Sequence, residues 1–271
     1  MSQTISRRQA ISLLTSAGAL VTSCTNNKPE PQVSPYRFAV ASDGHFGEPG
    51  TDYVRYYEDL LASLSRQHAE EPLDFTVING DLVHGTRPDL LPEVKNYLEK
   101  LPMPYFVTRG NHDRVSLQEW KSLWGYPTNH LVKLPSAALV LLDTSDSSGA
   151  YFCGNEEWLR TAIASVDPST PIFIFMHIPF IRSLTGSNNC DSIIAVINSF
   201  PNVKAIFHGH DHSLDMGVSI AGKHVFFDGR LGSSWGVSYR GYRMVEYSLN
   251  NQYKSWQFNL ETTTIMNETI F

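Results

Sequence analysis

Short, continuous runs of apolar residues alternate along this chain with longer amphipathic stretches, and this alternation constrains the fold more than any other feature of the sequence. Continuous apolar runs rich in β-branched and aromatic residues are typical of strands buried on both faces of a parallel sheet. The amphipathic stretches between them predict helices, so the sequence predicts an α/β fold. The expected strands are residues 37–42, 75–79, 105–108, 138–143, 172–176 and 203–207, and the expected helices are 53–68, 89–100, 117–123, 156–164 and 191–200.

The pattern changes after residue 223, where apolar and polar residues begin to alternate one by one. Residues 223–227, 242–248 and 252–258 follow this period of two. Such a period is typical of strands with one buried face and predicts antiparallel strands here. No internal repeat and no interdomain linker interrupts the chain from residue 36 onward, so we expect one domain over residues 36–271.

The first 23 residues have the composition of an export signal. Arg7 and Arg8 precede a stretch without charge, residues 10–23, that is too short and too polar for a membrane-spanning helix. The segment around the two arginines resembles a twin-arginine export signal. Residues 21–24 resemble a lipobox, which predicts a lipid on Cys24 and a bacterial protein anchored at the periplasmic or cell-surface face of a membrane. The alternative is that Cys24 merely follows an ordinary cleavage site.

Residues 24–35 are polar and contain proline, which predicts a flexible tether between the anchor and the domain. The other two cysteines, Cys153 and Cys190, would then lie in an oxidising compartment. They can form a disulfide only if the fold brings them together, and their spacing does not show whether it does. Three cysteines without C-x-x-C spacing exclude a zinc-finger scaffold.

The chain is acidic, with a formal net charge of −6. Removal of residues 1–23 would take away two arginines and no acid, which makes the charge −8. A domain with this charge offers no general attraction for nucleic acid or for an anionic membrane surface. We therefore expect no nucleic-acid partner, and contact with a membrane only through the lipid anchor.

Polar residues with metal-binding side chains follow five of the expected strands. Because the carboxyl ends of parallel strands open onto one crevice, five separate segments can build a single site. Carboxylate, amide and imidazole groups suit Zn, Mn or Fe, and a pair of such ions needs a bridging carboxylate, for which we expect Asp81. The segments are Asp43-Gly44-His45, Gly80-Asp81, Gly110-Asn111-His112-Asp113, His177 and Gly209-His210-Asp211-His212.

These segments match, in order, the motifs D-x-H, G-D, G-N-H-D, H and G-H-x-H, and in this respect the chain resembles the calcineurin-like metallophosphoesterases. The resemblance covers residues 37–212 and implies a four-layer αββα sandwich of two mixed β-sheets flanked by helices. It also implies two divalent or trivalent ions (Mn, Fe or Zn). The ligands that it implies are Asp43, His45, Asp81 and His212 for one ion, and Asp81, Asn111, His177 and His210 for the other.

The resemblance further assigns roles to the residues around the third motif. His112 would protonate the leaving alkoxide or stabilise a phosphoryl oxygen, and Asp113 would orient its ring or cap the following helix. Arg109, directly before the motif, would bind the substrate phosphate, and the alternative for it is an ion pair at the surface or at the edge of the core. His84 stands where purple acid phosphatases have a tyrosine ligand, which argues against an iron–tyrosinate centre.

The function that this resemblance implies is hydrolysis of phosphate esters, small molecules that carry a phosphomonoester or phosphodiester, by attack of a metal-activated hydroxide. The sequence leaves open a cyclic-nucleotide-type phosphodiesterase and a broad scavenging phosphatase. An alternative from another class is a catalytically silent surface protein that binds a nucleotide or a partner. Such a protein would be expected to have lost some of the metal-binding residues of the motifs, and none of them is missing here.

Overall fold

The computed structural model describes residues 36–181, 189–248 and 252–271, which form two six-stranded mixed β-sheets. The predicted signal peptide, the tether and Cys24 lie outside these residues. Within the described part of the chain, no helix is both long enough and apolar enough to cross a bilayer.

The first sheet has the strand order β12-β11-β10-β1-β2-β3. Its three strands from the first part of the chain are mutually parallel, and β10 to β12 add to it in antiparallel fashion. The bounds are β1 Tyr36–Ala41, β2 Phe75–Asn79, β3 Tyr105–Thr108, β10 Gly241–Tyr247, β11 Tyr253–Asn259 and β12 Ile265–Ile270.

The second sheet has the strand order β4-β5-β6-β7-β9-β8. Its four inner strands are parallel, and the two edge strands β4 and β8 are antiparallel to their neighbours. The bounds are β4 His130–Lys133, β5 Ala138–Leu141, β6 Ile172–Phe175, β7 Val203–His208, β8 Asp215–Ile220 and β9 Lys223–Asp228.

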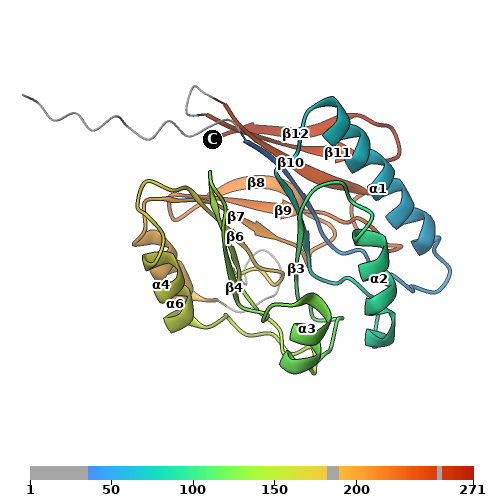
Figure 1. The fold of residues 1–271 in the computed structure, drawn as a ribbon, viewed down its shortest axis with the longest axis horizontal. Helices are drawn as coiled ribbons and strands as arrows, with labels where there is room; N and C mark the ends of the chain where they lie inside the picture. The colour runs from blue at the N-terminus through green and yellow to red at the C-terminus, as the bar shows by residue number, and fades with distance from the viewer. Residues whose placement is uncertain (1–35, 182–188, 249–251) are drawn as a thin grey trace, which may run out of the picture. The chain divides into compact units, whose positions relative to one another are not determined.

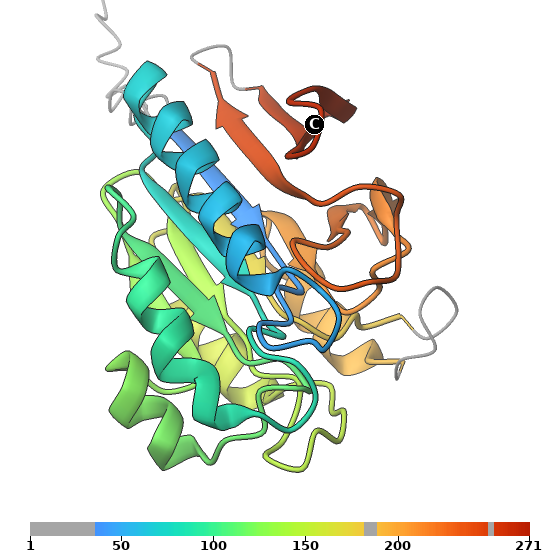
Figure 2. The same cartoon turned by 90° about the vertical axis from the view of Figure 1, so that its right-hand side faces the viewer.

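Helices cover the outer faces of both sheets, as Figures 1 and 2 show. The helices α1 (Tyr53–Glu70), α2 (Leu91–Leu98, after the 3₁₀ turn Pro88–Leu90) and α3 (Leu117–Trp124) pack on the first sheet. The helices α4 (Glu156–Ala164) and α6 (Asp191–Asn198) pack on the second. The fold is therefore the four-layer αββα sandwich that the sequence predicts.

Strand β1 shows how the sequence assigns side chains to the layers. Phe38 and Val40 point into the core between the two sheets, whereas Ala39 and Ala41 point toward the helices. Successive side chains of a strand face opposite sides, so residues 38–41, which lie between two layers, are apolar at every position. The Phe38 ring lies 4.9 Å from the ring of Phe173 in the other sheet, which joins the two sheets through aromatic contact.

The predicted elements agree with the structure except at three edge strands and in one direction. The sequence analysis missed β4, β8 and β12, which are short or partly exposed and therefore lack a continuous apolar run. Strand β9 was expected to be antiparallel, but it pairs in parallel with β7 and antiparallel only with β8. Residues 225–228 of β9 are buried on both faces of the sheet, as in a central parallel strand, so the alternating pattern did not report the direction of its neighbours.

The structure also decides the pairing of the two cysteines that the sequence left open. Cys153 and Cys190 form a disulfide, with Cα atoms 5.3 Å apart. The bond joins the loop before α4 to the residue before α6, two helices on the same face of the second sheet. It closes a sequence separation of 37 residues.

Candidate metal centre

The polar residues that follow the strands meet at the carboxyl ends of both sheets. Asp43, Asp81 and Asn111 follow β1, β2 and β3, and His177 and His210 follow β6 and β7. Three groups of carboxylate and imidazole atoms lie there, each with its atoms within 4.8 Å of one another. The groups are Asp43, His45 and His212; His45, Asp81 and His112; and Asp81, His177 and His210.

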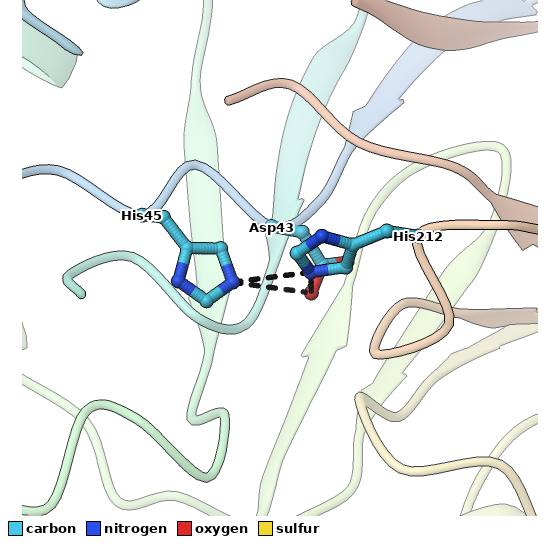
Figure 3. Close-up of side chains that lie close together, drawn as sticks. All are labelled: Asp43, His45 and His212. Carbon is cyan, nitrogen blue, oxygen red and sulfur yellow. Dashed lines mark hydrogen bonds and ion pairs between the residues drawn. The ribbon is translucent and has the colours of Figure 1, made fainter. Parts of the chain in front are cut away.

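The first group brings together residues from two sheets. Oδ1 of Asp43 lies 3.0 Å from Nε2 of His212 and 3.9 Å from Nε2 of His45. The two imidazole nitrogens lie 3.1 Å apart. Figure 3 shows the three side chains pointing toward one another, with an oxygen of the Asp43 carboxylate beside the facing nitrogens of the two rings.

Asp81 lies between the first group and the third. Its Oδ2 lies 3.6 Å from Nε2 of His45 and 3.2 Å from Nε2 of His177. Nδ1 of His210 lies 3.1 Å from Oδ1 of Asn111. All seven residues expected as ligands therefore lie in one cluster, with Asp81 between the two sets.

The backbone at this cluster adopts conformations that side-chain-bearing residues rarely take. Asp43, His45, Asp81 and His210 have φ angles of 57°, 42°, 48° and 70°. Left-handed backbone at a residue other than glycine costs free energy and persists where surrounding structure enforces it, commonly at functional sites. Gly110 shows how tightly the loops meet, because a Cβ on it would lie 2.1 Å from the backbone nitrogen of Asp81.

Burial and charge give the histidines of the cluster different protonation behaviour. Burial lowers the pKa of His45 to about 3 and of His210 to about 4, so both rings are neutral and can donate a lone pair. Burial also opposes the charged form of His177, but the carboxylates of Asp81 and Asp43 raise its pKa to about 10. The negative field that retains this proton would equally attract a cation.

Groups outside the ligand set orient the rings. Nδ1 of His177 donates to the carbonyl oxygen of Asn79 at 2.8 Å, and Nδ1 of His212 lies 2.8 Å from Oγ of Ser233. Such partners fix which nitrogen is free to bind a metal. The sequence analysis did not identify Asn79 or Ser233, because no motif marks them and only the fold brings them to the rings.

The cluster fits a metal centre by its own chemistry. Nε2 of His177 is fully buried and faces Oδ2 of Asp81 at 3.2 Å, without a well-aligned hydrogen bond. A buried nitrogen and a buried carboxylate oxygen that face each other in this way can both bind a cation. Carboxylate, amide and imidazole donors are also those that Zn, Mn and Fe accept.

The predicted pairing of Asp113 with His112 is wrong. One oxygen of Asp113 accepts from the backbone nitrogens of Leu82 and Val83 at 2.8 and 3.2 Å, and the other accepts from Gly110 at 2.7 Å. The carboxylate thus holds two loops of the site together by their backbones.

Asp113 does not cap α3 either. The N-cap of that helix is Ser116, whose side chain accepts from the backbone nitrogen of Glu119 in a capping box. The partner of the His112 ring is instead the backbone nitrogen of Gly85, which donates to Nδ1 at 3.1 Å.

The geometry of Arg109 does not support its predicted role in phosphate binding. The residue is 3% exposed, and its guanidinium donates to both carboxylate oxygens of Asp143, at 3.2 and 2.6 Å. It also donates to the carbonyl oxygens of Val115 and Ser145. The guanidinium therefore ties together the loops that follow β3 and β5, and its charge is neutralised inside the protein.

Comparison with known proteins agrees with this geometry. The sequence pattern of calcineurin-like phosphoesterases matches residues 36–214, which include every predicted ligand. The chain belongs to the calcineurin-like phosphoesterase family.

Curated relatives of this family member are named as phosphodiesterases. A probable cyclic nucleotide phosphodiesterase of Fibrobacter succinogenes is 22% identical over 68% of this chain and 75% of its own length. A 3′,5′-cyclic-nucleotide phosphodiesterase of Nostoc sp. is 25% identical over 57% of this chain and 62% of its own length. A glycerophosphodiester phosphodiesterase of Enterobacter lignolyticus is 26% identical over 53% of this chain and 57% of its own length.

Solved structures share the fold at low sequence identity. A dimetal phosphatase from Danio rerio is 15% identical, covers 87% of this chain and 98% of its own, and has a TM-score of 0.66. A purple acid phosphatase from yellow lupin is 12% identical, covers 88% of this chain and 54% of its own, and has a TM-score of 0.65. These likenesses support the two-sheet architecture.

Proposed function

We propose that this protein is a metal-dependent phosphoesterase that hydrolyses phosphodiesters in preference to phosphomonoesters. The observation that carries the proposal is the position of Asp81 between two sets of buried ligand atoms, which fits a pair of ions that share one carboxylate. The preference for diesters is supported by the names of the relatives, which include cyclic-nucleotide and glycerophosphodiester phosphodiesterases.

In this proposal Asp43, His45, Asp81 and His212 hold one ion. Asp81, Asn111, His177 and His210 hold the other. Two bound ions would supply Lewis-acid neutralisation of the phosphate charge and lower the pKa of water. The ligand set accepts Mn, Fe or Zn.

His112 acts in this proposal through its Nε2 atom. Because Gly85 donates to Nδ1, the neutral ring carries its proton on Nε2, which lies 4.0 Å from Asp81 in a side chain that is 28% exposed. Protonation of Nδ1 would place two N–H groups against each other, and burial also lowers the pKa of the ring. His112 therefore serves as a neutral hydrogen-bond donor to substrate oxygen rather than as an imidazolium acid.

Hydrolysis by the purified full chain tests this proposal. We expect bis-p-nitrophenyl phosphate to be cleaved faster than p-nitrophenyl phosphate when Mn or Zn is added, and a chelator to abolish both activities. Absence of hydrolysis with every metal would contradict the proposal and favour a binding protein. A faster reaction with the monoester would identify a phosphatase.

We also propose that the protein is exported and anchored by a lipid on Cys24. The support is the sequence of residues 1–35 alone. Expression of the full chain and of Cys24→Ala in a bacterial host, followed by membrane fractionation, tests it. We expect the native chain in the membrane fraction and the variant outside it, and an equal distribution of both would contradict the anchor.

A further inference from the structure

The loop of residues 229–240, which joins β9 to β10, lies against the proposed metal centre, where its Ser233 orients the ring of His212. Its backbone is fixed to the ligand-bearing segments. The backbone nitrogen of Gly232 donates to the carbonyl oxygen of Asp43 at 2.9 Å, and that of Val237 donates to the carbonyl oxygen of His212 at 2.7 Å. The loop is therefore held at both sides of its tip.

Side chains make the same loop rigid. Arg230 donates to the carbonyl oxygens of Gly232, Ser233 and Val237 at 3.0, 2.7 and 3.0 Å, which closes the loop on itself. A loop held in this way loses little further conformational freedom when a ligand binds, so a side chain at its tip is preorganised.

That side chain is Trp235, which is 45% exposed. Its ring lies 4.6 Å from the ring of His212 at an interplanar angle of 15°, and 5.1 Å from the ring of His45. The other four tryptophans of the chain are buried or half-buried. Stacking on His212 fixes the indole beside the proposed metal centre and leaves nearly half of its surface open to a ligand.

The position of the indole relates it to the substrate. Its ring centroid lies 6.1 Å from that of His84, which in turn lies 5.8 Å from that of His112. The three rings form one wall around His45, and the wall includes the residue that would donate to substrate oxygen. A substituent of the ester that extends along this wall passes across Trp235.

We infer that Trp235 stacks on the base of a nucleotide substrate and is a specificity-determining residue of this site. The inference rests on the proposed phosphoesterase function. A flat aromatic face recognises a planar base irrespective of its hydrogen-bonding pattern, whereas esters of the uncharged alcohol glycerol have no planar group to stack and no cation to bind the ring. The indole therefore favours esters of nucleosides over esters of aliphatic alcohols.

Kinetics of Trp235→Ala and Trp235→Phe test this inference in the metal-loaded full chain, with cyclic AMP and glycerophosphoglycerol as substrates. We expect Trp235→Ala to raise KM for cyclic AMP about tenfold, which corresponds to about 1.4 kcal/mol, and to leave KM for glycerophosphoglycerol unchanged. Trp235→Phe retains an aromatic face and should restore most of the affinity. Equal effects on both substrates would overturn the inference.

Fluorescence gives a readout that does not depend on turnover. Binding of adenosine monophosphate should quench the emission of the native protein and of Trp158→Phe, which keeps the exposed indole, but not that of Trp235→Phe. Glycerol 3-phosphate should quench none of them. Absence of quenching by the nucleotide in the native protein would overturn the inference.

Metal content separates stacking from structural support. Trp235→Ala should retain as much metal as the native protein, and loss of metal would assign the indole to packing against His212 and overturn the inference. Failure of the proposed function has a different signature, because the native protein would then hydrolyse no phosphate ester, bis-p-nitrophenyl phosphate included.

Discussion

The Nδ1 atoms of His45 and His84 lie 3.2 Å apart. If Nε2 of His45 binds a metal ion, Nδ1 of that ring carries the proton and donates it to Nδ1 of His84. His84 then fixes the tautomer and the orientation of a ligand without touching the ion, a role that commonly increases the affinity for the metal.

His84→Ala should therefore weaken metal binding about 10- to 100-fold, because His45 loses the acceptor that orients it. Competition with a chromophoric chelator measures this change. The matched control is His224→Ala, which removes a half-buried histidine of β9 that packs on the ring of Phe271. Equal metal affinity of His84→Ala and the native protein would contradict the role.

Asp81→Asn and His112→Asn should separate metal binding from catalysis. The first removes the carboxylate between the two ligand sets, so we expect loss of metal and, with it, of activity. The second should keep the metal but lower kcat by about 10²-fold or more, because it removes a positioned hydrogen-bond donor. Elemental analysis and turnover, measured on the same preparations, check both. Native metal content and native activity in both variants would contradict the site.

Arg109→Ala should destabilise the protein instead of weakening substrate binding. The change leaves the carboxylate of Asp143 buried without its partner, which typically costs about 3–5 kcal/mol. Urea unfolding measures the loss, and Arg160→Ala, which breaks an exposed pair with Glu156, is the control. A raised KM with unchanged stability would contradict this prediction and show that Arg109 binds the substrate phosphate.

Asp228 should make stability depend on pH. Burial raises its pKa from 3.8 to about 7, against the opposing effect of the Arg243 guanidinium. Between these values the folded protein holds a proton that the unfolded chain releases, so stability is greatest at the acid end of this window. It should fall as pH rises toward 7, by on the order of 1 kcal/mol per pH unit.

Urea unfolding from pH 4.5 to 8 measures this contribution. Asp228→Asn should remove most of the dependence of the unfolding free energy on pH in this range. The same change at the exposed Asp89 should leave that dependence intact. An unchanged slope in Asp228→Asn would show that another group is responsible.

The sequence by itself determined the type and order of most elements and the identity of the predicted ligands. Strand β6 is apolar at every position and β1 at every position but Arg37. The polar residues Asp43 and His177 follow these strands, at the side of the sheets where the carboxyl ends of the parallel strands lie. Both signals are local along the chain, so they can be read without the fold.

Only the tertiary structure decided which side chains support those residues. His84 meets His45 from 39 residues away, and Arg109 meets Asp143 from 34 residues away. Trp235 reaches His45 through a loop after β9. These contacts depend on strand order, on register and on how the two sheets pack, and no pattern in the neighbouring residues encodes them. For the same reason the sequence analysis paired His112 with the adjacent Asp113. In the folded protein the backbone nitrogen of Gly85 donates a hydrogen bond to the His112 ring instead.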